Sequence, residues 1–276
     1  MVNLREFQKA QLSILKTVNE ILTKHDICPF LVGGSCLGAV RHGGVIPWDD
    51  DIDIGLFRSD YEKARIILQK ELPEKFILCD RHTEKEYPLN FYRIRMNGTA
   101  YVQDYSTRLN IHQGIFMDVF PFDARPDDDK LFKKQYKKSQ FLKKCLSLKN
   151  MSFKKMGKIR PVKQLIPIFI GHIFVNRTRA QNKLDKVITQ YNDSCENSKY
   201  LLNFLSIYDE NDHVERKWLT NLKECDFDGV PSYITSFHDD YLSLLYGDYM
   251  TPPPKDKRTP HHGIVFASLT EEYQKK

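Results

Sequence analysis

Residues 51–57, DIDIGLF, constrain the fold of this chain more than any other segment. Strict alternation of charged and apolar residues at the start of this segment is the pattern of a β-strand. Asp51 and Asp53 would point to one face of that strand, and the isoleucines between and after them to the other. With Asp49 and Asp50 just before, four carboxylates fall within five positions. Such crowding is unfavourable unless a cation compensates it.

A divalent metal explains this carboxylate pattern. Hard oxygen ligands suit Mg²⁺, which keeps part of its water shell and takes its remaining ligands from substrate phosphates. We predict that Asp51 and Asp53 bind one or two Mg²⁺ ions and act in catalysis, with Mn²⁺ as an alternative ion. Asp118 lies in a further predicted strand, GIFMDVFPFD. We expect it to bring a third carboxylate, as a metal ligand or as the general base.

The other two aspartates of the run leave alternatives open. Asp49 shares the parity of Asp51 and Asp53, so it either joins the metal ligands or only orients the adjacent tryptophan. Asp50 is expected at the surface or as a helix N-cap. A calcium loop of the EF-hand type is excluded, because no start within the run puts a glycine sixth and a glutamate twelfth.

A glycine turn precedes the aspartates. Gly33, Gly34 and Ser35 separate a short predicted strand, ICPFLV, from a helix for which Ser35 would be the N-cap. Glycines let a backbone approach phosphates closely, so these three residues are predicted to bind substrate. Arg41 and His42, one turn further, are candidates for phosphate contact; the alternative is an ordinary pair of cations at a helix end.

Helices and strands are mixed along the rest of the first half, which indicates an α+β protein. Residues 3–25 have the periodicity of an amphipathic helix, and a second helix is expected after Ser59 as N-cap. KFILCD, NFYRIRM and TAYVQDY read as strands, the last two joined by a turn at Asn97-Gly98. Arg93 and Arg95 alternate on one strand, so both face a cleft or both face solvent. We favour Arg93 as a substrate-binding residue.

The positive charge of the chain is local. Residues 130–163 contain twelve lysines and Arg160 with no Asp or Glu, which leaves 29 Lys and Arg against 36 Asp and Glu elsewhere. An apolar run, QLIPIFIGHIFV, follows and is interrupted by Pro167 and Gly171. Residues 130–175 are either a solvated helical face or a contact with an anionic membrane surface. Nucleic acid is not an expected partner, because no familiar recognition fold accompanies the charge.

Six cysteines lack C-x-x-C pairs and metal-ligand spacing, so we expect reduced thiols. The amino end lacks the apolar core of a signal peptide, and no window has the length of a membrane span. These features predict a cytoplasmic protein, with a peripheral position at the inner face of the plasma membrane as the alternative.

Three segments resemble the LicD family, which includes bacterial phosphocholine transferases and the catalytic domains of fukutin-type proteins. They are GGSCLGAVRHGGVIPWDDDIDIGLFRSDYEKA, GIFMDVFPFD and YGDYMTPPPKDKRTPHH. The resemblance runs from about residue 20 to residue 262. It implies a nucleotidyltransferase-like mixed sheet flanked by helices. It also implies that Lys255 and Arg258 bind donor phosphate, whereas composition alone favours a solvated tail. His261 and His262 have no partner at the spacing of zinc ligands.

We therefore predict three parts in one α+β protein. Residues 1–129 form a nucleotidyltransferase-like catalytic core, residues 130–200 a basic and mostly helical insertion, and residues 201–276 complete the catalytic domain.

The resemblance implies Mg²⁺-dependent transfer of a phospho-alcohol, foremost phosphocholine, from a CDP-linked donor to a hydroxyl of a cell-surface glycan. The acceptor would be a lipid-linked precursor of teichoic acid, lipopolysaccharide or capsule, and CMP would be released. Two enzymatic alternatives remain: a CDP-ribitol or CDP-glycerol phosphotransferase, and an NTP-dependent nucleotidyltransferase acting on a small molecule. A membrane-surface scaffold without activity is the non-enzymatic alternative.

Overall fold

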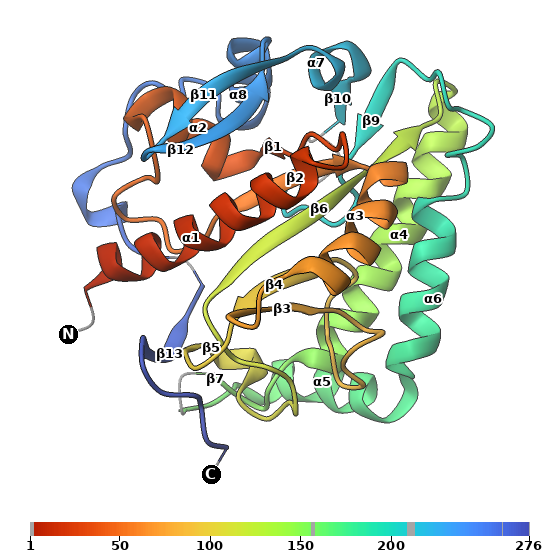
Figure 1. Cartoon of the computed structure of the whole chain (residues 1–276). Helices are drawn as coiled ribbons and strands as arrows, with labels where there is room; N and C mark the ends of the chain where they lie inside the picture. The colour runs from red at the N-terminus through yellow and green to blue at the C-terminus, as the bar shows by residue number, and fades with distance from the viewer. Residues whose placement is uncertain (1–2, 156–157, 209–212, 261, 276) are drawn as a thin grey trace.

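A curled mixed sheet lies at the centre of the molecule (Figure 1). The computed structural model describes residues 3–155, 158–208, 213–260 and 262–275. The main sheet has the order β1-β2-β6-β4-β3, with β9 on the second half of β6 and β10 on β9. Its one parallel pair is β2 with β6. Its strands are β1 (Phe30–Leu31), β2 (Asp53–Phe57), β3 (Phe76–Cys79), β4 (Tyr92–Met96), β6 (Phe116–Arg125), β9 (Tyr200–Leu202) and β10 (His213–Glu215).

Helices α1 (Leu4–Thr23) and α3 (Arg58–Glu71) cover one face of this sheet (Figure 1). The side chain of Asn3 caps α1 by accepting a hydrogen bond from the amide of Arg5 (3.1 Å). The apolar stripe of α1 is buried in the main core, as its periodicity predicted. The sheet and its helices confirm the predicted α+β class and are consistent with a nucleotidyltransferase-like fold.

Two predicted helix starts were wrong. Helix α2 (Gly33–His42) begins at the glycine turn itself with Val32 as N-cap, so Ser35 lies inside the helix. The left-handed conformation of Gly33 (φ +53°) allows this early start. Helix α3 begins at Arg58 with Phe57 as N-cap, and Ser59 makes no cap. Both starts are fixed by the preceding buried strand, which leads directly into each helix.

The predicted turn at Asn97-Gly98 is present, with Gly98 at φ +69°, but the strands it joins do not pair with each other. Strand β5 (Ala100–Gln103) pairs instead with β13 (Ile264–Ser268). Strands β5 and β13 form a separate two-stranded sheet, which brings the C-terminal segment back beside the first half of the chain. That return contributes directly to the site described below.

A layer of helices forms the second part of the chain, consisting of α4 (Asp129–Asn150), α5 (Val162–Phe174) and α6 (Arg177–Ile188). Helices α4 and α6 share a small hydrophobic core with the segment after β9. The predicted interruption at Pro167 and Gly171 is wrong, since α5 continues through both. A two-stranded element, β7 (Lys154–Lys155) and β8 (Lys158–Ile159), joins α4 to α5. Within the described residues, every helix is too short or too polar to cross a membrane.

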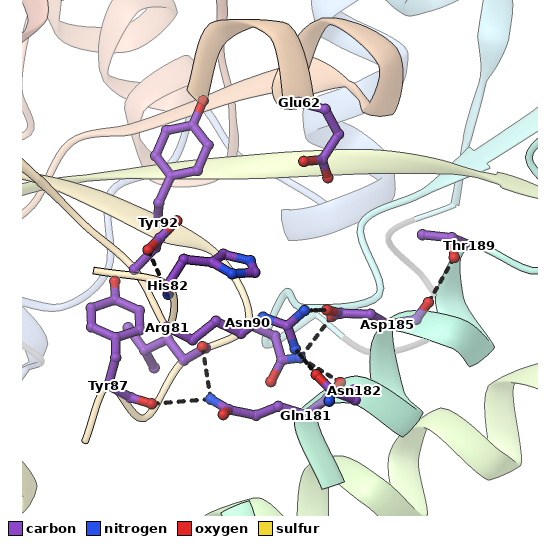
Figure 2. A network of polar contacts seen from close by, with 12 residues as sticks. Glu62, Arg81, His82, Tyr87, Asn90, Tyr92, Gln181, Asn182, Asp185 and Thr189 are labelled. Carbon is purple, nitrogen blue, oxygen red and sulfur yellow. Dashed lines mark hydrogen bonds and ion pairs between the residues drawn. The ribbon is translucent and has the colours of Figure 1, made fainter. Parts of the chain in front are cut away.

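Polar contacts attach α6 to the loop between β3 and β4 (Figure 2). Gln181 donates from Nε2 to the carbonyl of Tyr87 (3.0 Å), and Asn90 donates to Asp185 Oδ1 (2.7 Å). Arg81 completes the contact with an ion pair to Asp185 (2.6 Å). Because several of these groups are buried, the network holds the helical layer in one orientation against the sheet.

The C-terminal part packs over α2. It contains a hairpin and two helices, and then a short 3₁₀ turn leads to β13. These elements are α7 (Arg216–Thr220), β11 (Leu222–Phe227), β12 (Val230–Thr235), α8 (His238–Tyr246) and the turn Lys255–Lys257. Helix α8 contacts α2, so it lies beside the glycine turn. The three-part division at residues 129 and 200 stays a prediction.

Candidate active site

The register of three neighbouring strands brings the predicted acids together. Asp53 on β2 lies opposite Asp118 on β6, and Asp118 lies opposite Arg93 on β4. Residues opposite each other in a sheet share a face, so the three side chains stand abreast. The prediction that a third acid arrives from a neighbouring strand is confirmed. Strand β2 starts only at Asp53, but Asp51 still points the same way, because Ile52 between them is fully buried.

Asp51, Asp53 and Asp118 form a cluster that suits a metal ion. One carboxylate oxygen from each lies within 4.8 Å of the others. The Oδ1 atom of Asp53 is buried and has no hydrogen-bond partner among the described residues. Burial raises the pKa of Asp51 and of Asp53 well above the usual range, and repulsion among the carboxylates adds to it. A buried cluster of three carboxylates offers the oxygen ligands that suit Mg²⁺ or Mn²⁺.

Arg93 holds Asp118 in place. Its Nε and Nη2 donate to the two carboxylate oxygens of Asp118 (2.6 and 3.0 Å), and its Nη1 donates to Gln103 (2.7 Å). Both charged side chains are about 95% buried, at 4% and 5% exposed. This bidentate pair is the strong form of a charge-assisted hydrogen bond. Arg93 therefore lies in the cavity wall, with its guanidinium largely occupied. Arg95 is buried outside that wall and donates to the carbonyl of Gly114 (2.7 Å), so neither predicted alternative holds for both arginines.

Asp50 does not lie at the surface or cap a helix, so that prediction was wrong. It is 1% exposed, and its Oδ1 accepts a hydrogen bond from Nδ1 of His262 (2.8 Å). Nε2 of the same histidine lies 3.2 Å from Asp51. Burial lowers the pKa of His262, but the hydrogen bond to Asp50 and the charge of Asp51 outweigh this and raise it to about 9. The C-terminal segment thus supplies a cation to the aspartate cluster.

A cavity of about 840 Å³ opens beside these carboxylates. Its wall contains most of the residues predicted from the sequence, and four predicted residues lie outside it. Those in the wall are Gly33, Gly34, Arg41, Asp49, Asp51, Asp53, Arg93 and Asp118. Those outside the wall are Ser35, His42, Lys255 and Arg258.

The glycine turn packs closely against the segment that carries the aspartates. A Cβ atom on Gly34 would lie 2.8 Å from Oδ2 of Asp49, so only glycine fits there without a shift. The Oγ of Ser35 accepts a hydrogen bond from the amide of Asp53 (2.9 Å) and so fixes the start of β2. The amide of Gly33 donates to the hydroxyl of Tyr241 (3.0 Å). Phosphate binding by this turn stays a prediction.

Arg258 and His42 contact Trp48, which lines the cavity, although neither residue belongs to the cavity wall itself. Arg258 lies 5.1 Å from the centre of the indole ring, and the His42 ring meets its edge at 5.6 Å. Burial lowers the pKa of Arg41 and of His42, and the charge of Arg258 lowers both further. Neighbouring cations that depress one another form a site that favours an anion. Lys255 is exposed in the 3₁₀ turn that precedes Arg258.

Tyrosines of α8 and its flanks are a part of the site that sequence reasoning missed. Tyr241, Tyr246 and Tyr249 line the cavity together with Tyr208, whose hydroxyl is hydrogen bonded to that of Tyr246. A signal was available, since three tyrosines fall within residues 241–249, two of them in the segment that carried the family resemblance. Spread over a chain with 14 tyrosines, they did not stand out as a group.

We expect Mg²⁺ binding to release protons. The pKa values of Asp51 and Asp53 are raised without metal, so a metal must displace protons from this cluster, and the apparent affinity should rise with pH. Isothermal titration in buffers of different ionisation enthalpy measures the number released. Asp53→Asn should release fewer protons, whereas Asp193→Asn, at an exposed position, should match the wild type. Equal proton release from wild type and Asp53→Asn would contradict the assignment.

The mixed sheet flanked by helices, with three carboxylates gathered beside a large cavity, is consistent with a nucleotidyltransferase-like fold. Residues 26–161 match the family described as LicD/FKTN/FKRP, nucleotidyltransferase domain. The chain therefore carries a domain of the LicD family, which confirms the resemblance found in the sequence.

Three relatives illustrate the extent of this similarity. The chain is 27% identical over 273 residues to the lipopolysaccharide cholinephosphotransferase LicD of Haemophilus influenzae, covering 95% of this chain and 96% of that protein. It is 58% identical over 100 residues to the human ribitol 5-phosphate transferase FKRP, but this covers only 17% of that protein. The match to human ribitol-5-phosphate transferase FKTN is 37% over 62 residues, or 13% of that protein.

Proposed function

We propose that this protein transfers phosphocholine from CDP-choline to a hydroxyl of a cell-surface glycan and releases CMP. The observation that carries the proposal is the convergence of Asp51, Asp53 and Asp118 on one cavity, in a chain that aligns over nearly its whole length with a cholinephosphotransferase. The similarity to this enzyme and to ribitol phosphate transferases supports the broader activity, which is transfer of a phospho-alcohol to a glycan.

Two features favour choline over ribitol or glycerol as the head group. The cholinephosphotransferase relative is covered over 96% of its length, whereas the ribitol phosphate transferases are covered over 17% or less. In addition, the cavity wall carries a group of tyrosines, Tyr208, Tyr241 and Tyr246, next to Asp49. Aromatic faces near a carboxylate suit a quaternary ammonium group.

Different residues of the site would bind the metal ion and the phosphates of an anionic donor. Asp51, Asp53 and Asp118 would hold Mg²⁺, which when bound neutralises charge on the phosphate and polarises it towards attack. Arg93 fixes the orientation of the Asp118 carboxylate through two hydrogen bonds. Arg41 and the neighbouring Arg258 favour the phosphates at the Trp48 end of the cavity. Because both oxygens of Asp118 accept from Arg93, its geometry favours a metal-ligand role over that of general base.

Product analysis tests this function directly. The purified chain with Mg²⁺ and acceptor glycan is incubated with CDP-choline, CDP-ribitol or CDP-glycerol, and CMP release is measured. We expect acceptor-dependent CMP release with CDP-choline and little with the other two donors. A preference for CDP-ribitol would mean that ribitol phosphate, and not phosphocholine, is the group transferred, with the type of reaction unchanged. Pyrophosphate release from an NTP with a small-molecule acceptor, and no CMP from any CDP-alcohol, would identify a nucleotidyltransferase and contradict the proposal.

A further inference from the structure

Helix α5 turns its apolar side outward. Six large apolar residues of this helix are between 49% and 78% exposed. Their spacing of i, i+4, i+7, i+8, i+11 and i+12 places them on one helical face. This surface, the α5 apolar stripe, consists of Val162, Ile166, Phe169, Ile170, Ile173 and Phe174. Folded monomers seldom expose so many adjacent large apolar side chains without a partner for them.

The opposite face of α5 is anchored to the rest of the protein, so the outward direction of the stripe is fixed. Gly171 is buried against α4, where a Cβ atom would lie 2.7 Å from Cβ of Leu148. Ile168 is 1% exposed on the same inner face. Lys149 donates from Nζ to the carbonyl of His172 (2.7 Å), and Arg108 contacts the His172 ring (3.1 Å). Figure 1 shows α5 at the lower edge of the molecule, below α6.

The part of the chain that contains the stripe carries formal charge of one sign. Residues 130–184 contain 16 Lys and Arg and no Asp or Glu. Many of these lysines are exposed on α4, while Lys163 is exposed on α5 itself. Protein–protein interfaces are depleted of lysine, whereas anionic lipid surfaces attract it. The charge therefore complements an anionic membrane and opposes a basic protein surface, including a second copy of this one.

We propose that the α5 apolar stripe docks this protein onto an anionic membrane surface. With 13 residues, α5 is about 20 Å long, which is less than the roughly 30 Å core of a bilayer. The helix lies in the plane of the membrane surface, with the stripe among the acyl chains and the lysines at the head groups. The inference does not depend on the proposed transfer reaction, because it uses no residue of the cavity wall.

Vesicle sedimentation tests the docking surface. Wild-type protein is expected to bind vesicles of phosphatidylcholine with phosphatidylglycerol, and to bind less to phosphatidylcholine alone or at high salt. Phe169→Gln with Phe174→Gln should weaken binding roughly tenfold or more, because both side chains leave the apolar phase. The matched control is Ile66→Gln with Ile77→Gln, at positions 48% and 41% exposed outside the helical layer. This control should bind like the wild type.

Two further measurements make the result decisive. Thermal melting by circular dichroism should be similar for all variants, because the replaced side chains are exposed. Sedimentation equilibrium without vesicles reports the oligomeric state. The proposal is overturned by absent wild-type binding to anionic vesicles, or by equal binding of the α5 variant and wild type. A wild-type dimer that the α5 variant converts to monomer would instead make the stripe an interface between two copies.

Discussion

Replacing Asp53 with asparagine is expected to lower CMP release by about 1,000-fold or more. Asp53 occupies the centre of the acidic cluster, and its Oδ1 atom is buried without a partner in the described chain. Asparagine keeps the size of the side chain and one acceptor oxygen but removes the charge that would bind the metal. Initial rates with CDP-choline, acceptor and Mg²⁺ measure the effect.

Stability separates this loss of activity from misfolding. In the presence of a chelator, Asp53→Asn should unfold at the same temperature as the wild type or higher, because one of several repelling carboxylates is removed. Added Mg²⁺ should raise the unfolding temperature of the wild type, since it binds only the folded cluster, and should raise that of the variant little. Retained activity, or an undiminished Mg²⁺ effect in the variant, would show that Asp53 is not a metal ligand.

Arg93→Met is expected to reduce the free energy of unfolding by about 3–5 kcal/mol near neutral pH. The substitution leaves the buried carboxylate of Asp118 without its bidentate partner, next to other acids. Urea denaturation monitored by circular dichroism measures the free energy of unfolding of the wild type and the variant.

The matched control is Arg5→Met. Arg5 forms a similar pair with Asp228, but its side chain is 45% exposed, so the expected cost is only about 0–1 kcal/mol. Adding Asp118→Asn to Arg93→Met should recover part of the loss, because the unpaired charge is then gone. Equal losses of unfolding free energy in Arg5→Met and Arg93→Met would mean that burial does not determine how much the Arg93–Asp118 pair contributes to stability.

Much of the fold was predictable because it is encoded in local periodicity. The amphipathic helix at residues 3–25, the alternation around Asp51 and Asp53 and the strand that carries Asp118 each follow from a repeat of 3.6 or 2 residues. Helix starts were less predictable. Ser59 matches the residue preference of an N-cap, yet α3 continues directly from β2 and needs no such cap. At this position the packing of the strand and the helix, and not the residue preference for an N-cap, determines where the helix begins.

The candidate site, like the fold, was predictable only in part. Asp51, Asp53 and Asp118 were identified from spacing within single strands, together with the family resemblance. Their partners were not, because the contacts join distant segments. Arg93 reaches Asp118 across 25 residues of chain, and His262 reaches Asp50 across 212. The position of Asp50 shows the limit most clearly, because its parity pointed away from the other acids, yet the returning C-terminal segment covers it.

The sequence by itself determined which residues carry negative charge on one strand face, where the basic segment lies and which family the chain resembles. Those properties depend on order along the chain and on side-chain chemistry. Only the tertiary structure decided that Asp118 is held by Arg93, that His262 supplies a cation, that tyrosines line the cavity and that the apolar side of α5 faces outward. These depend on strand register and on the packing of segments far apart in sequence, which no local pattern encodes.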